Sequence, residues 1–101
     1  RDGAMKIVVL ASAERDLAEA TTYYLEHATA GIARAFLDEF RHATGLLAGY
    51  PEIGAPVSGE QRMTHFRRFP YSIIYRLRPD SVVIRAIAHH RRKPKVRQAG
   101  Q

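Results

Sequence analysis

The chain has 101 residues, a net charge of +6 and no cysteine, and 46% of its residues are hydrophobic and 26% charged. This length suits one small domain, and the composition is that of a globular protein. The lack of cysteine excludes disulfide frameworks, thiolate metal sites and cysteine nucleophiles. No apolar run approaches the roughly 18 residues that a membrane span requires. We read residues 1–4 as a vector-derived remnant before Met5, residues 5–96 as a single domain and residues 97–101 as a tail.

The positive charge is concentrated in the second part of the chain. Residues 1–60 hold 5 Lys/Arg and 9 Asp/Glu, a net −4, whereas residues 61–101 hold 11 Lys/Arg and one acid, a net +10. The stretch AIAHHRRKPKVR (Ala86–Arg97) is the densest part. A basic segment of this kind attracts a polyanion or an acidic protein. A solvated surface that only keeps the protein soluble explains the charge equally well.

The first elements in chain order are a strand and a helix. Lys6–Leu10 is apolar and β-branched without alternation, which predicts a strand that is central in a sheet or covered on both faces. Ser12 is a good N-cap for the helix expected over residues 13–28. The apolar stripe of this helix is formed by Leu17, Ala20, Tyr24 and Ala28.

A second amphipathic helix follows after a short break at residues 28–31 and ends near Gly49. Its stripe consists of Ile32, Phe36, Phe40, Ala43 and Leu47. So short a link predicts an antiparallel helical hairpin. Tyr50–Gly59, with two prolines and two glycines, is typical of a loop.

The remaining pattern predicts three strands. The first begins at Met63, the second is Tyr71–Arg78, and the third runs from Val82 to His90 after a turn at residues 79–81. In the second strand Tyr71 and Tyr75 share the apolar face, which indicates core packing. Short connections indicate an antiparallel meander, so the whole order is β-α-α-β-β-β, an α+β fold in which the hairpin covers one face of the sheet.

Several stretches together resemble the ParE branch of the RelE/ParE toxin superfamily, the plasmid-stabilisation toxins of toxin–antitoxin pairs. The resemblance spans nearly all of Met5–Lys95. It rests on ERDLAEATTYY, on PEIG, and above all on RRFPYSIIYR and the strand end HHRRKP. It implies the fold just described and a toxin in the bacterial cytoplasm, with no cofactor and no metal.

The resemblance also implies partners and sites. ParE-like members poison DNA gyrase by protein contact, without a catalytic site, and a ParD-like antitoxin with an acidic tail neutralises them. No membrane and no direct sequence-specific nucleic-acid contact is expected. The residues assigned to the target are Arg91, Arg92 and Lys93. Those assigned to the antitoxin or the adjoining basic surface are Arg67, Arg68, Arg76 and His89.

Two alternatives stay open. RelE-like members cleave messenger RNA on the ribosome, and here Arg76 and Arg85 as cations and His89 as proton carrier are the candidates. Arg76 and Arg85 lie on neighbouring strands and are expected to share a face. However, the lysine-rich second strand and C-terminal tyrosine of such nucleases have no match in this chain. The second alternative is a non-toxic relative that only binds, because Lys93 replaces an acid common in the family and no aromatic residue follows near Arg97.

Structural roles compete with these assignments. A histidine at a strand end, such as His89, is more often a hydrogen-bonding structural residue than a proton carrier. His90 is expected to be simply exposed, with its side chain on the opposite face from His89. Arg76 and Arg85 are also candidates for surface pairing with Asp80 or Glu60, which would contribute little stability.

Overall fold

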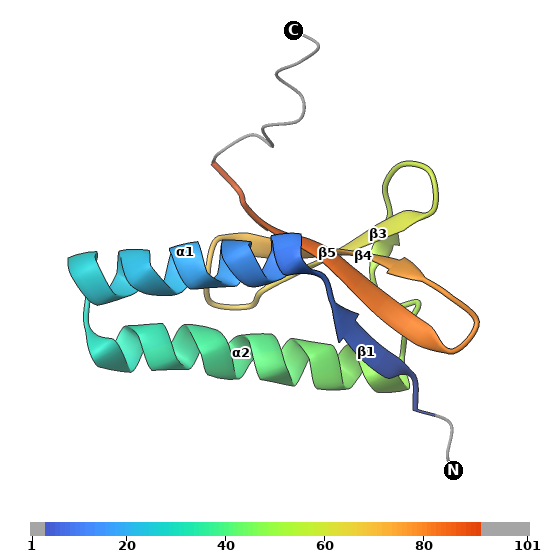
Figure 1. Ribbon diagram of the computed structural model, residues 1–101, viewed down its shortest axis with the longest axis horizontal. Coiled ribbons are helices and arrows are strands. Elements are labelled where there is room, and N and C mark those ends of the chain that lie inside the picture. Colours follow the sequence, from blue (N-terminus) through green and yellow to red (C-terminus); the bar gives the residue numbers. More distant parts are fainter. Residues whose placement is uncertain (1–3, 92–101) are drawn as a thin grey trace, which may run out of the picture.

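The computed structural model describes residues 4–91 and shows a helical hairpin packed on one sheet (Figure 1). The helices are α1 (Ala11–His27) and α2 (Ala30–Gly49). The strands are β1 (Lys6–Val9), β2 (Ala55–Pro56), β3 (Gln61–His65), β4 (Tyr71–Leu77) and β5 (Ser81–His89), in the spatial order β1-β5-β4-β3-β2. The predicted α+β fold and the antiparallel meander of the last three long strands are confirmed.

The placement expected for the first strand is wrong. β1 lies at one edge of the sheet and pairs in parallel with β5, with Ile7 opposite Val82. Its residues after Lys6 are nevertheless all apolar, because both faces of the strand meet apolar neighbours. Ile7 and Val9 pack against the core under the helices, whereas Val8 lies beside Val83 on the other face.

Ser12 does not cap α1, contrary to the sequence prediction. The N-cap position is Leu10, and Ser12 lies within the first turn, where its hydroxyl donates to the Arg85 carbonyl at 2.7 Å. One helical turn later, Asp16 accepts a hydrogen bond from the Ile87 backbone N–H at 2.9 Å. β1 ends opposite Ile84, so these two side chains supply partners to the β5 edge beyond that point.

The helical hairpin forms as predicted, and its core side is aromatic. Thr29 caps α2 by accepting from the Ile32 N–H at 3.0 Å. Phe36 is fully buried, and its ring stacks on Phe66 with centroids 5.0 Å apart. Ile32, in contrast, is 41% exposed although it belongs to the predicted stripe.

The predicted loop Tyr50–Gly59 contains the short strand β2 and is fastened by Tyr75. The Tyr75 hydroxyl accepts from the Gly54 N–H at 2.9 Å and donates to the Pro51 carbonyl at 2.8 Å. A Cβ atom at Gly54 would lie 2.6 Å from that hydroxyl oxygen, so only glycine allows this approach. The predicted core positions of Tyr71 and Tyr75 are confirmed, since they are 3% and 0% exposed.

A register irregularity in β5 determines which side chains face the helices. Ile74 pairs with Ala86 but Tyr75 pairs with Ile84, so Arg85 is the extra residue of a β-bulge. Before the bulge Ile84 faces the core, and after it Ile87 does so. The alternation of β5 therefore changes phase at Arg85, which the sequence pattern alone did not indicate.

Candidate functional site

The basic segment after β5 is described only at its start. Arg91 is exposed, and its backbone N–H donates to His89 Nδ1 at 3.0 Å. Arg92 and Lys93, also assigned to the target, lie outside the described residues. The hydrogen bond at His89 matches the structural role weighed for a histidine at a strand end.

His89 and His90 point to opposite faces, as predicted. His89 pairs with Tyr71 in the sheet register, and the two rings meet edge-on with centroids 4.9 Å apart. His90 lies on the other face, where its Nε2 is 2.9 Å from Ser72 Oγ. His90 is exposed, as predicted, and its ring also has a specific partner in Ser72.

Ser72 has a second histidine partner that sequence reasoning missed. His65 Nδ1 lies 2.6 Å from Ser72 Oγ, and the His65 and His90 rings are 5.1 Å apart in an edge-on arrangement. His65 stands opposite Ser72 in the β3–β4 register.

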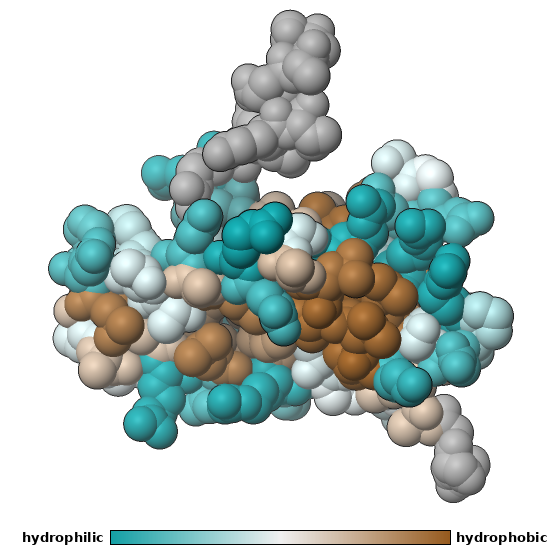
Figure 2. Space-filling model, viewed as in Figure 1, coloured by the Kyte–Doolittle hydropathy of each residue, from teal (hydrophilic) through white to brown (hydrophobic). Residues whose placement is uncertain are grey.

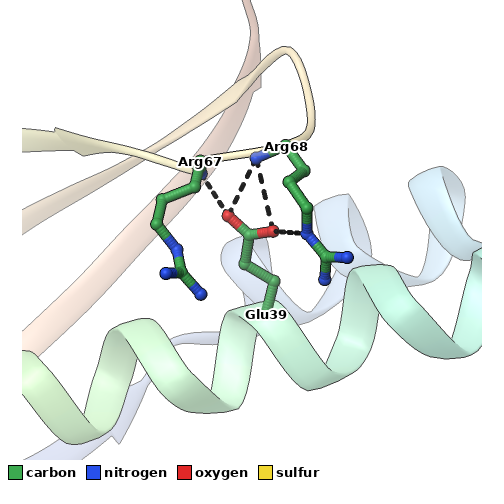
Figure 3. A network of polar contacts seen from close by, with 3 residues as sticks. All are labelled: Glu39, Arg67 and Arg68. Carbon is green, nitrogen blue, oxygen red and sulfur yellow. Dashed lines mark hydrogen bonds and ion pairs between the residues drawn. The ribbon is translucent and has the colours of Figure 1, made fainter.

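Arg67 and Arg68 lie in the β3–β4 loop and are held by a buried carboxylate of α2 (Figure 3). Glu39 accepts from both backbone N–H groups, and its Oε1 also lies 3.2 Å from Arg68 Nε. Glu39 is 3% exposed, whereas the Arg68 side chain is 63% exposed. The loop therefore carries two arginines with exposed side chains on a backbone that is fixed to α2, and the Arg68 guanidinium also contacts Glu39 (Figure 3).

The pKa of Glu39 reflects two opposing effects. Burial raises the pKa because it disfavours the charged carboxylate. Hydrogen bonds from the Arg67 and Arg68 backbone N–H groups, together with the Arg68 guanidinium, outweigh burial and leave the pKa below its ordinary value. Glu39 is thus an ionised anchor for the loop, and sequence reasoning did not single it out.

Arg76 and Arg85 share the face of the sheet that the helices leave uncovered. Arg76 stands opposite Gln61 in the register, and Arg85 donates to Gln61 Oε1 at 3.1 Å. Arg85 thus uses Gln61, rather than the Asp80 or Glu60 considered from the sequence. The prediction that the two arginines share a face agrees with this geometry.

Hydrophobic side chains gather beside these arginines. Figure 2 shows a broad hydrophobic area where β1 and β5 lie in the view of Figure 1. The register places Val8, Val83 and Ile74 on the uncovered face, each half-buried. We call this surface, with Arg76 and Arg85, the open face.

The candidate nuclease residues are not brought together. Arg76 and Arg85 lie on the open face, whereas His89 lies on the face that carries Tyr71 and the core. The histidines that do reach the open face, His65 and His90, are bound at Ser72. Ser72 is four residues from Arg76 along β4, about 13 Å in a strand.

A small groove lies between α2 and β3. Its apolar walls include Leu46, Leu47 and Ile53, and His42, His65 and Arg67 also line it. Ile53 is 53% exposed and Leu46 39%. Beyond Met63, moreover, β3 pairs with no strand on this side among the residues the structure describes.

Residues 4–91 contain no group of three or more His, Asp or Glu side chains arranged to hold a metal ion. In the same range, no helix has the length and apolar character needed to cross a membrane.

Comparisons with known proteins place this geometry in a family. Three solved structures are similar in fold, each matched by one chain. A ParDE toxin–antitoxin system from P. aeruginosa has a TM-score of 0.76 at 18% identity, covering 87% of this chain and 98% of the other. The toxin–antitoxin complex RelBE2 from Mycobacterium tuberculosis has a TM-score of 0.58 at 23% identity, and the match covers 85% of this chain and 98% of the other. The DinJ–YafQ toxin–antitoxin complex from E. coli has a TM-score of 0.61 at 14% identity, and the match covers 87% of this chain and 94% of the other.

No curated protein matches the chain. The family model described as the ParE toxin of the type II toxin–antitoxin system parDE, however, matches residues 7–94. This match takes in every described helix and strand except Lys6, the first residue of β1, and it continues through the first basic residues after β5. The chain therefore belongs to the ParE toxin family of type II toxin–antitoxin systems.

Proposed function

We propose that this ParE family member is a toxin that binds and inhibits DNA gyrase without catalysing a reaction, and that a cognate antitoxin neutralises it. The observation that carries the proposal is the family match, which continues through the end of β5 to residue 94. The segment assigned to the target, Arg91–Lys93, thus lies within the part of the chain that is typical of ParE toxins.

The placement of the charged residues favours binding over catalysis. Cleavage of an RNA phosphodiester needs a proton carrier and cations around one phosphate. Arg76 and Arg85 share the open face, but His89 lies on the opposite face of the sheet. A binding role requires only exposed cations, and Arg91 is exposed at the end of β5.

Guanidinium groups are suited to contact with an acidic protein surface. They keep their charge at all physiological pH values and bind carboxylates through two parallel hydrogen bonds. Arg91 begins a run of cations in the sequence, RRKPK, that follows directly on β5. We propose that this run contacts gyrase.

The α2–β3 groove is the surface we propose for the antitoxin. Arg67 and two histidines line it around apolar walls, and the one acid in the lining, Glu39, is already bound by Arg67 and Arg68. An acidic segment with an apolar side chain is therefore complementary to it. The edge of β3 beyond Met63 also offers backbone groups to an added strand. Arg67 and Arg68, fixed by Glu39, would then pair with antitoxin carboxylates.

The test compares two doubly substituted proteins. Arg91→Ala with Arg92→Ala should weaken inhibition of gyrase supercoiling by about thirtyfold, the effect of losing about 2 kcal/mol at a binding hot spot. Arg15→Ala with Arg34→Ala removes the same charge from exposed positions on the helices and should leave inhibition near that of the unaltered protein.

Pulse-labelling after induction without antitoxin identifies the target in cells. We expect DNA synthesis to fall before protein synthesis. An earlier fall in protein synthesis would favour the nuclease alternative and move attention to Arg76 and Arg85. No fall in either would indicate a relative that has lost toxicity.

A further inference from the structure

The Ser72 cluster, defined as Ser72 with His65 and His90, is a polar group of residues 4–91 whose geometry neither the fold nor the proposed function explains, although His65 also lines the groove between α2 and β3. Two imidazole nitrogens converge on one hydroxyl, at 2.6 and 2.9 Å. Ser72 is only 2% exposed although the helices do not cover its face of the sheet. The two histidine rings lie over it instead.

The hydrogen-bonding capacity of the Ser72 hydroxyl explains why Ser72, His65 and His90 hold one another in place. A serine hydroxyl has one proton to donate and can accept further hydrogen bonds, so Ser72 donates to one ring nitrogen and accepts from an N–H of the other ring. Loss of such a bond leaves a buried polar group without its partner, which is costly. The rotamer of His90 is therefore set by Ser72, and His65 fixes the Ser72 hydroxyl from the other side.

The cluster lies where the chain leaves the sheet. The His90 backbone N–H donates to the Pro70 carbonyl at 2.8 Å, while the His90 ring is held on the open face. On the opposite face, the His89 ring packs on Tyr71 and its Nδ1 accepts from the Arg91 N–H. The two residues before Arg91 are thus held on both faces of the sheet.

A nucleophilic role for Ser72 does not fit this burial, because a substrate would have to reach a hydroxyl oxygen that the two rings cover. A role of the Ser72 cluster in stability alone does not explain why the cluster lies next to Arg91. The cluster ties β3 and β4 to the last described residues, next to the residue assigned to the target.

We propose that Ser72 is a positioning residue of the toxin: through His90 it sets the direction in which Arg91 leaves the sheet and so presents Arg91 to the target. The assignment of Arg91 to the target rests on the proposed function. The positioning itself is a property of the free protein and is measured separately from it.

The experiment uses Ser72→Ala, which removes the hydroxyl, and Ser72→Thr, which keeps it on a β-branched side chain suited to a strand. Ser81→Ala is the matched control, because Ser81 is also buried, at 8% exposure, and starts β5 at the other end of the sheet. Thermal unfolding confirms that each variant is folded. Growth arrest on induction measures toxicity whatever the target is.

Nitrogen-15 NMR of the free protein gives the second readout. In Ser72→Ala the NMR signals of the His90 ring nitrogens and of the Arg91 amide should shift. Toxicity should also fall, so that growth arrest needs about tenfold more inducer. Ser72→Thr should restore both, and Ser81→Ala should change neither.

Two results would overturn the inference. One is unchanged His90 and Arg91 signals in a folded Ser72→Ala protein, since Ser72 would then not hold the chain end. The other is shifted signals with full toxicity, since the direction of Arg91 would then not matter. If gyrase proves not to be the target, both readouts still apply, so the two proposals fail separately.

Discussion

The two faces of the sheet differ in what they contribute. The face under the helices is built from large apolar side chains that are almost completely buried, such as Ile73, Tyr75 and Ile84, each 0% exposed. The open face carries smaller half-buried apolar groups, two arginines and the Ser72 cluster. Stability is therefore concentrated on the covered face, whereas the open face carries half-buried and exposed polar groups.

The largest effect should come from the covered face. Phe36→Ala removes a fully buried ring that contacts Phe66, Phe69 and Tyr71, and should lower the free energy of unfolding by about 3–5 kcal/mol. Urea denaturation measures this loss. Ile74→Ala on the open face should cost clearly less, and an equal loss at both sites would contradict the division of the sheet into two unequal faces.

A smaller effect is expected where the covered face meets the basic loop. Glu39→Gln keeps the size of the side chain but removes the charge that accepts from the Arg67 and Arg68 N–H groups. Hydrogen bonds to charged groups contribute about 1.5–3 kcal/mol, so the free energy of unfolding at neutral pH should fall by about 2 kcal/mol.

The pH dependence of that loss follows from the lowered pKa of Glu39. An unfolded glutamate titrates near 4.3, and the folded pKa lies lower, so the stabilisation is complete above about pH 4.3 and is lost as pH falls through the folded pKa. The difference in the free energy of unfolding between the unaltered protein and Glu39→Gln should be constant from neutral pH to about pH 5 and should become smaller in acid. Glu19→Gln, on an exposed part of α1, is the control and should have nearly the same free energy of unfolding as the unaltered protein.

The smallest effect on stability should come from the open face. Arg85 is exposed, and its hydrogen bond to Gln61 is a surface contact, so Arg85→Ala should change the free energy of unfolding by no more than about 0.5 kcal/mol. Growth arrest should also persist, because the proposed mechanism does not use Arg85. Loss of arrest in a stable Arg85→Ala protein would favour the nuclease alternative.

Local patterns predicted the elements of the fold because each has its own periodicity. The stripe through Phe36 and Leu47 has helical spacing, and Tyr71, Ile73 and Tyr75 alternate as a strand does. Partners across the chain were harder to predict. The parallel pairing of β1 with β5 depends on where the helical hairpin returns the chain, and an apolar run of four residues has the same composition at an edge as in the centre.

The candidate site was predictable only in part, for a related reason. Charge density pointed to Arg91 and its neighbours, and strand alternation separated His89 from His90. Glu39, in contrast, lies on a helix among ordinary polar residues, and its role depends on a loop 28 residues away in sequence. The bulge at Arg85 changes which residues of β5 face the core, and no residue type in the stretch AIAHH predicts it.

The parallel pairing of β1 with β5 has a consequence for the synthesis of the protein. Lys6 pairs with Ser81, so β1 finds its partner only when β5 has been made, after all the other described elements. Contacts so distant in sequence make folding slow, because a long loop must close before they form. The sheet is therefore completed only after β5 has been synthesised, and until then the apolar side chains of β1 lack their partners in β5.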